Sequence, residues 1–157
     1  MTDNASGVLF DLLHSQLVAY IYSTIDNKNK GVSQLESLGF RVGVSLGEQL
    51  TKDLPRFRDE LEVMKFICRD FWSSLYQKQV DNLRTNHQGV YVLQDNAFKL
   101  LTHISVGKQY LDCAPRYLAL SCGLIRGVLS NLGVKSVVTS EVISMPSAKF
   151  QIMVQRT

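Results

Sequence analysis

Two segments of the chain with helical periodicity carry a small residue at every fourth position. The first glycine ladder is Gly39, Gly43 and Gly47, and the second ladder is Ala119, Gly123 and Gly127. Residues four apart share one face of a helix, so each ladder leaves a face almost without side chains. Each internal glycine costs about 1 kcal/mol of helix stability, which a closely approaching backbone can offset. We interpret the first ladder as a docking face for a partner subunit, whereas packing in the chain's own core is an open alternative for the second.

The size and composition indicate an ordinary folded protein. The chain has 157 residues, of which 45% are apolar and 20% are charged, so we expect one domain spanning residues 1–157. The net charge is +3 without a cluster of Lys and Arg, and this argues against a nucleic-acid partner. Residues 1–7 are polar, and no apolar run is long enough to span a bilayer. We therefore expect a cytoplasmic protein.

Apolar spacing predicts four helices, at 8–22, 33–50, 53–75 and 114–132. A capping box formed by Ser33 and Glu36 marks the start of the second helix, and Pro55 marks the start of the third. Gly133 marks the end of the fourth. Phe71 and Trp72 on the third helix are expected in the core.

The strands are predicted as two hairpins. The first turns at 87–89, between strands near 83–86 and 90–93, and the second turns at 144–147, between 134–143 and 150–154. Residues 94–114 remain undecided between helix and turn. Because the helices are not interleaved with parallel strands, this order predicts an α+β fold with helices packed on one face of an antiparallel sheet of about four strands.

No pattern in the sequence specifies a catalytic centre. Ser45 lies in a literal G-x-S-x-G, the nucleophile elbow of α/β-hydrolases, but an elbow joins a strand to a helix and Ser45 falls inside a predicted helix. The three histidines lack metal-ligand spacing, and the three cysteines include no C-x-x-C pair and are expected to be reduced. Arg126, within the second ladder, is expected to pair with a neighbouring group. We therefore predict no enzyme activity, no cofactor and no metal.

Four segments of the chain resemble the small subunits of the transport protein particle, TRAPP. They are Gly-Phe-Arg-Val-Gly at 39–43, Phe-Arg-Asp-Glu at 57–60, the stretch 83–95, and Cys-Gly-Leu-Ile-Arg-Gly at 122–127. The resemblance covers about residues 9–154 and implies the α+β fold of TRAPP subunits 3 and 5. It further implies a non-catalytic scaffold that forms a heterodimer with subunit 3 through its first two helices.

The same resemblance implies a place in the cell. Complexes of this family tether vesicles between the endoplasmic reticulum and the Golgi apparatus and act as guanine-nucleotide exchange factors for Rab-type GTPases. The chain would therefore contact other TRAPP subunits directly, a Rab GTPase indirectly, and the membranes of the endoplasmic reticulum and cis-Golgi only peripherally through the complex.

The expected docking surface combines the first helix with the first glycine ladder. Its residues are Leu9, Leu13, Leu17, Phe40, Gly43 and Gly47. In the related subunit 3, a cysteine before the third helix can carry a fatty acyl chain. Leu54 occupies that position here and Cys68 lies further along, so no acyl anchor is expected. Two other functions remain alternatives: a stand-alone lipid- or acyl-binding domain and a small serine hydrolase using Ser45.

Overall fold

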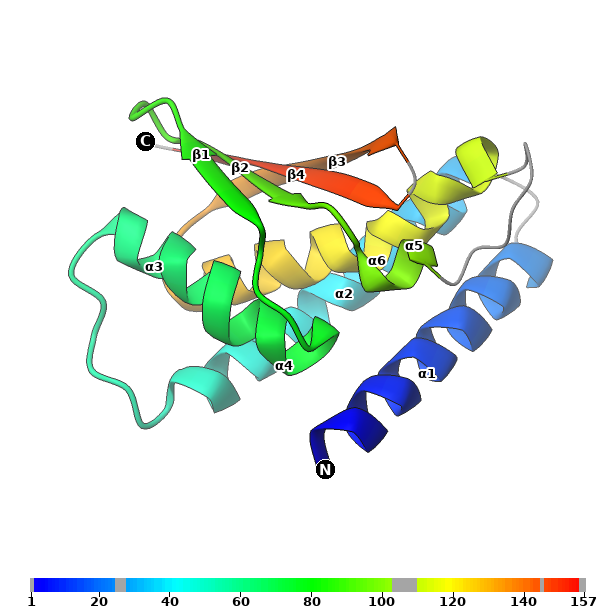
Figure 1. The fold of residues 1–157 in the computed structure, drawn as a ribbon, viewed down its shortest axis with the longest axis horizontal. Coiled ribbons are helices and arrows are strands. Elements are labelled where there is room, and N and C mark those ends of the chain that lie inside the picture. Colours follow the sequence, from blue (N-terminus) through cyan, green and yellow to red (C-terminus); the bar gives the residue numbers. More distant parts are fainter. Residues whose placement is uncertain (1, 25–27, 103–109, 145, 156–157) are drawn as a thin grey trace.

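The computed structural model describes residues 2–24, 28–102, 110–144 and 146–155. Its helices, shown in Figure 1, are α1 (Thr2–Thr24), α2 (Lys28–Thr51), α3 (Glu60–Phe66), the π-helical turn η1 (Ile67–Phe71), α4 (Trp72–Tyr76), α5 (Lys99–Thr102) and α6 (Tyr110–Asn131). Its strands are β1 (Asn82–Thr85), β2 (Val90–Asp95), β3 (Ser136–Ser144) and β4 (Ser147–Val154). Both predicted hairpins are therefore confirmed.

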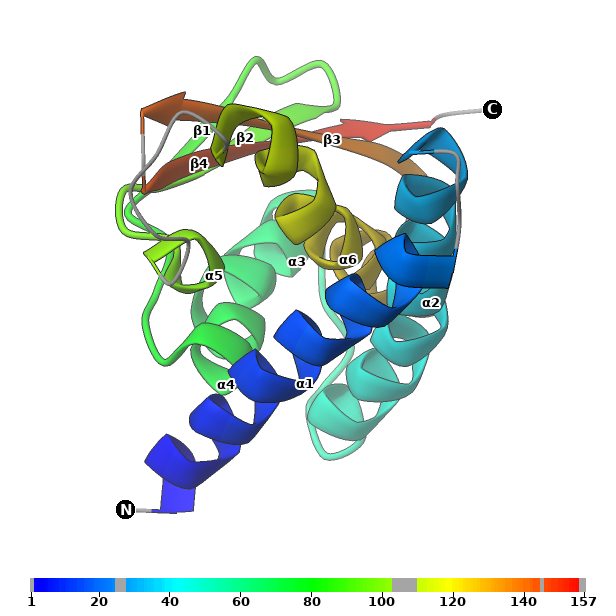
Figure 2. The same ribbon diagram turned by 90° about the vertical axis from the view of Figure 1, so that its right-hand side faces the viewer.

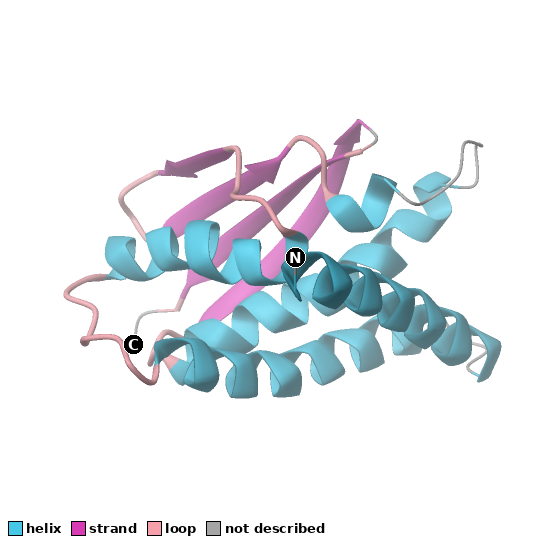
Figure 3. Cartoon of the chain, turned by 60° about the horizontal axis from the view of Figure 1, so that its bottom comes forward, coloured by secondary structure: helices cyan, strands magenta, loops and turns pink. Residues whose placement is uncertain are grey.

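The strands form one antiparallel sheet in the order β1-β2-β4-β3, and the helices lie on one face of it. The helix α6 packs against β3, α2 packs on α6, and α1 crosses the side of the helical layer that lies away from the sheet (Figures 1 and 2). The predicted α+β fold is confirmed. Figure 3 shows how the antiparallel strands stack above the bundle of helices.

The two small-residue ladders pack against each other. Carbonyl oxygens of each helix occupy the positions that side chains would take on the glycines of the other: Leu120 and Leu124 face Gly39 and Gly43, and Glu36 and Phe40 face Gly123 and Gly127. The glycine Cα hydrogens therefore point at carbonyl oxygens, an arrangement that favours weak C–H···O contacts. The contact between α2 and α6 is thus made by backbone on backbone.

This packing corrects our interpretation of the first ladder. Gly39, Gly43 and Gly47 are all buried against α6 of the same chain, so they do not form a docking face for a partner. The alternative considered for the second ladder, packing in the chain's own core, is the one that the structure supports. Each ladder offsets its helix cost with the close approach of the other.

The helices α2 and α6 begin earlier in the structure than the sequence predicted. The helix α2 begins at Lys28, so the capping box at Ser33 lies inside the helix, and Gly31, about two turns before Gly39, is also buried. The helix α6 begins at Tyr110 rather than near Pro115, and residues 103–109 of the undecided stretch lie outside the described residues. Local capping signals were therefore outweighed by packing of α2 on α6.

The predicted third helix begins later and is interrupted. Asp59, not Asp53, is the N-cap of α3: its side chain accepts a hydrogen bond from the Glu62 backbone N–H at 2.8 Å, and Glu62 accepts one from the Arg58 N–H at 2.6 Å. In the π-helical turn that follows, the Cys68 carbonyl accepts a hydrogen bond from the Val80 N–H at 3.0 Å. This turn ties the helix to the strand segment that follows it.

The aromatic core forms between α4 and the sheet. Phe71 and Trp72 are fully buried, as predicted, and the Trp72 ring lies 5.4 Å from that of Phe150 on β4. The buried Asp95 carboxylate accepts hydrogen bonds from the Trp72 indole N–H at 2.8 Å and from Lys78 Nζ at 2.6 Å. A buried carboxylate needs such partners because desolvation disfavours its charge. The network fixes the end of β2 against α4.

We expect Gly43→Ala and Gly47→Ala to differ sharply. A methyl group at Gly43 would overlap the Leu124 carbonyl oxygen, a backbone atom that cannot move alone, so this variant should lose at least about 2 kcal/mol of unfolding free energy. At Gly47 the nearest atoms lie 3.3 Å away and include the Asn131 side chain, so the improved helix propensity should keep the change below about 1 kcal/mol. Urea unfolding measures both, and equal losses would contradict the packing described.

Candidate functional site

The helix α1 exposes large apolar side chains on the face opposite its core contacts. Leu9, Leu12 and Leu13 are 60–68% exposed, and Tyr20 is 67% exposed. The leucines are one, three and four residues apart, so they form one continuous patch on the helix, here called the α1 leucine face. Exposed apolar patches of this kind are typical of interaction surfaces.

The opposite face of α1 is anchored by polar and aromatic groups. His14 is 2% exposed and its ring lies 5.7 Å from that of Tyr117 on α6, while Phe10 lies 6.1 Å from the Tyr76 ring. Lys99 Nζ lies 3.5 Å from the Asp11 carboxylate. Burial lowers the pKa of His14 to about 4, against the opposing effect of Asp11. His14 is therefore neutral at neutral pH, and α1 is held through a ring that resists protonation.

The helix α2 adds a second exposed apolar strip next to its buried glycines. Leu38 and Val42 are exposed at 38% and 43%, and their four-residue spacing places them on one face. Phe40 is partly buried because the Arg126 guanidinium lies over its ring, 4.6 Å from the centroid. The pairing expected for Arg126 is thus a cation–π contact with Phe40. The guanidinium also attracts the nearby carboxylate of Glu36.

The predicted docking residues divide into three groups. Leu9 and Leu13 are exposed and available, and Leu17 and Phe40 are half-buried at the edge of the core. Gly43 and Gly47 are wrong as docking residues because α6 covers them.

Sequence reasoning also missed exposed residues of the same surface. Leu12, Tyr20, Leu38 and Val42 were not included, although all four are exposed. The available signal was the width of the apolar stripe on the first helix, because a stripe that includes Leu9, Leu12 and Leu13 as well as Val18 and Ile21 is wider than one buried face requires.

Other candidate chemistry is not assembled. Ser45 is exposed in the middle of α2, without the strand and sharp turn that a nucleophile elbow requires. Cys68 and Cys122 are buried free thiols whose pKa is raised to about 12 by burial, so both stay protonated. Within the described ranges, no group of three or more His, Cys, Asp or Glu side chains could hold a metal ion. None of the described helices is long and apolar enough to cross a membrane.

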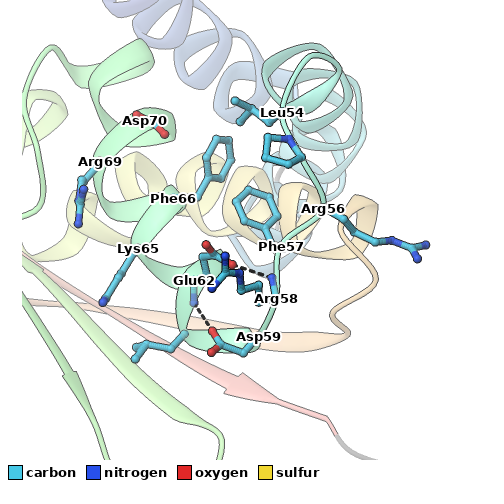
Figure 4. A pocket seen from close by; sticks show the side chains of 12 residues that line it. Leu54, Arg56, Phe57, Arg58, Asp59, Glu62, Lys65, Phe66, Arg69 and Asp70 are labelled. Carbon is cyan, nitrogen blue, oxygen red and sulfur yellow. Dashed lines mark hydrogen bonds between the residues drawn. The ribbon is translucent and has the colours of Figure 1, made fainter.

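A hollow of about 530 Å³ lies between the α2–α3 loop and α3 (Figure 4). The Phe57 and Phe66 rings pack at 5.2 Å inside it, and Arg56, Lys65 and Asp70 are among the charged side chains around it. Both signs of charge line the hollow, and it is open to solvent. It therefore shows no preference for an anionic or a purely apolar ligand.

The fold and the exposed apolar faces of α1 and α2 define a small α+β domain whose helices pack on one face of a four-stranded antiparallel sheet. Residues 10–155 match the family of the transport protein particle (TRAPP) component, and the chain belongs to this family. Trafficking protein particle complex subunit 6b of Danio rerio is 59% identical over 97% of this chain and 99% of the relative. Subunit 6B of Homo sapiens is 57% identical over 97% and 99%, whereas subunit 6A of Mus musculus is 49% identical over 98% and 99%.

These identities place the chain nearer to the 6B than to the 6A relatives. Among solved structures, a trafficking protein particle complex subunit 3 from Naegleria fowleri, covalently bound to palmitic acid, superposes with a TM-score of 0.83. The match covers 97% of this chain and 96% of the other at 15% identity. At that identity the match shows a shared fold.

Acid should loosen the anchoring of α1. The folded-state pKa of His14, about 4, lies below its ordinary value of 6.5, so the unfolded chain binds a proton first as pH falls. The stability from neutral His14 is complete above pH 6.5 and is lost as pH falls toward 4, by roughly 3 kcal/mol. Urea unfolding at several pH values should show this slope, and His14→Gln should flatten it. The same slope in both proteins would contradict the assignment.

Proposed function

We propose that this protein is a non-catalytic scaffold subunit of the TRAPP complex and that it forms a heterodimer with TRAPP subunit 3 through α1 and α2. The observation that carries the proposal is the α1 leucine face, because three adjacent leucines are mostly exposed on a helix whose other side is already buried. The subunit names of the relatives support the choice of complex.

The leucine face suits a permanent protein interface. Full burial of a leucine side chain contributes about 1.5–3 kcal/mol, so covering Leu9, Leu12 and Leu13 is a substantial source of association energy. Such apolar clusters are typical of the centres of obligate interfaces. Leu38 and Val42 on α2 extend the proposed contact, and Leu17 and Phe40 lie at its inner edge.

The cellular role follows from membership of the complex. As a scaffold, the chain would position other TRAPP subunits in a vesicle-tethering and Rab guanine-nucleotide exchange complex in transport between endoplasmic reticulum and Golgi. It would reach a Rab GTPase only indirectly and the membrane only peripherally. The catalytic alternative has no support from Ser45, which lies within a continuous helix.

We also propose that this subunit carries no acyl anchor. The α2–α3 loop from Lys52 to Asp59 has no cysteine, and Leu54 is the residue that we align with the acylated position of subunit 3. Cys68 is buried, and its raised thiol pKa leaves little thiolate to attack a thioester.

Leu13→Glu should abolish the heterodimer without unfolding the chain. Leu13 is 64% exposed, so the monomer should tolerate a carboxylate there, whereas burial of that charge in an interface is costly. We expect at least a tenfold weaker affinity for co-purified subunit 3 by light scattering and calorimetry. Leu54→Glu, at an exposed leucine outside α1 and α2, is the matched control and should bind normally. A normal heterodimer mass for Leu13→Glu would refute the proposal.

The acyl proposal predicts the mass of the protein isolated from eukaryotic cells. The intact mass should be that of the chain without a palmitoyl group, because no accessible thiol lies at the α2–α3 loop. Hydroxylamine-sensitive palmitate on Cys68 would show that the proposal is wrong.

A further inference from the structure

The strand β3 forms one edge of the sheet. The backbone N–H and C=O groups of every second residue of β3 point outward, away from β4. The Val154 N–H donates to the Gly89 carbonyl on the β2 side, whereas the Gln155 N–H donates to the Lys135 carbonyl on the β3 side, each at 2.8 Å. Successive residues of a strand point to opposite edges. Lys135 and every second residue after it therefore bond β4, and Ser136, Val138 and Ser140 direct their N–H and C=O groups outward.

This edge has little of the protection that natural edge strands carry. The strand β3 runs for nine residues, is rich in β-branched side chains, and has Glu141 as its one charged residue. Its bulge lies at the far end, between Val142 and Ser144. Lysine, proline or a central bulge would normally discourage pairing with another chain. The first half of β3 is therefore an open template for an added strand.

A small hollow of about 150 Å³ lies beside the same half of β3. It is lined by Glu36 of α2, by Cys122, Gly123 and Arg126 of α6, and by residues 136–138 of β3. The Ser136 hydroxyl is buried in it, with the residue 8% exposed, and finds no hydrogen-bond partner among the described residues. A buried hydroxyl without a partner is costly, so the hollow lacks a polar group that a ligand could supply.

We propose that the β3 edge binds an extended peptide segment of another protein, which adds an antiparallel or parallel strand and places one small, neutral polar side chain in the hollow beside Ser136. Main-chain hydrogen bonds to an edge supply affinity in this mode, and pockets for alternate side chains supply specificity. Serine, threonine or asparagine fits the hollow because Glu36 and Arg126 bring opposite charges to its rim, which leaves no demand for a charged ligand.

A second copy of this chain fits the edge less well. An antiparallel β3–β3 pair must match outward-directed residues with one another, so the residue opposite Ser136 would be Val142 or another member of the same set. Those side chains already face the helices of their own copy, where Val138 and Val142 pack against the core. They cannot also fill the hollow of a neighbour, whereas a free peptide can.

The test uses the full chain and a phage-displayed library of random linear 12-residue peptides, followed by calorimetry with the selected peptides in synthetic form. Val138→Pro removes an outward N–H from β3 and leaves the bonds to β4 intact. Leu83→Pro is the matched control: it removes the corresponding outward N–H from β1, the opposite edge strand, and like Val138 it has a half-buried side chain. Thermal melts establish that both variants are folded.

The proposal expects peptides with alternating β-branched residues that bind at least tenfold more weakly to Val138→Pro and unchanged to Leu83→Pro. Their binding should protect the Val138 and Ser140 amides from hydrogen exchange. Ser136→Ala should weaken them while raising the melting temperature of the free chain, because it removes the buried hydroxyl. Failure to select peptides, equal binding to both proline variants, or protection of β3 by self-association alone would overturn the proposal.

Discussion

The contact between α2 and α6 depends on the absence of side chains, because carbonyl oxygens of each helix occupy the space where the other would carry a Cβ. Four C–H···O contacts at about 0.5–1 kcal/mol each offset about half or more of the roughly 4 kcal/mol that four helical glycines cost, and the close helix packing contributes the rest. The close approach also fixes the rotation of α2 about its axis. Its glycines face inward, Phe40 comes to lie under Arg126, and Leu38 and Val42 face outward.

The helix α1 differs from α2 and α6, because it packs on the core through one face and carries exposed leucines on the other. Its inner face uses His14 and Asp11 together with Val18 and Ile21, and its outer face carries Leu9, Leu12 and Leu13. Polar groups are tolerated inside because α5 and α6 supply partners such as Lys99 and the Tyr117 backbone. If the inner face of α1 were also purely apolar, its two faces would be chemically alike, and either face could pack on the core. The polar groups therefore specify which face is buried.

The sequence allowed the sheet and the fold class to be predicted because both hairpins carry local turn signals and alternating side chains. It could not assign the glycine ladders to their partner, since a bare helix face looks the same whether the neighbouring backbone is another chain or a helix 84 residues further along the same chain. The predicted start of α2 was wrong for a related reason: the capping box at Ser33 is a local signal, whereas Val32 and Leu35 on either side of it pack with Val18, Ile21 and Ala119 from other helices. Leu9 and Leu13 are exposed in the structure, and the apolar spacing of α1 is visible in the sequence, but their role in docking stays a prediction.

The two proposed binding regions differ in the physical basis of recognition. The α1 leucine face offers apolar area, which gives association energy without direction and suits a partner that stays bound. The β3 edge offers oriented backbone groups and one unsatisfied hydroxyl, which give register and side-chain choice at small area and suit a short segment. Phe40 and Arg126 connect them, because the ring borders the helical surface and the guanidinium above it lines the hollow.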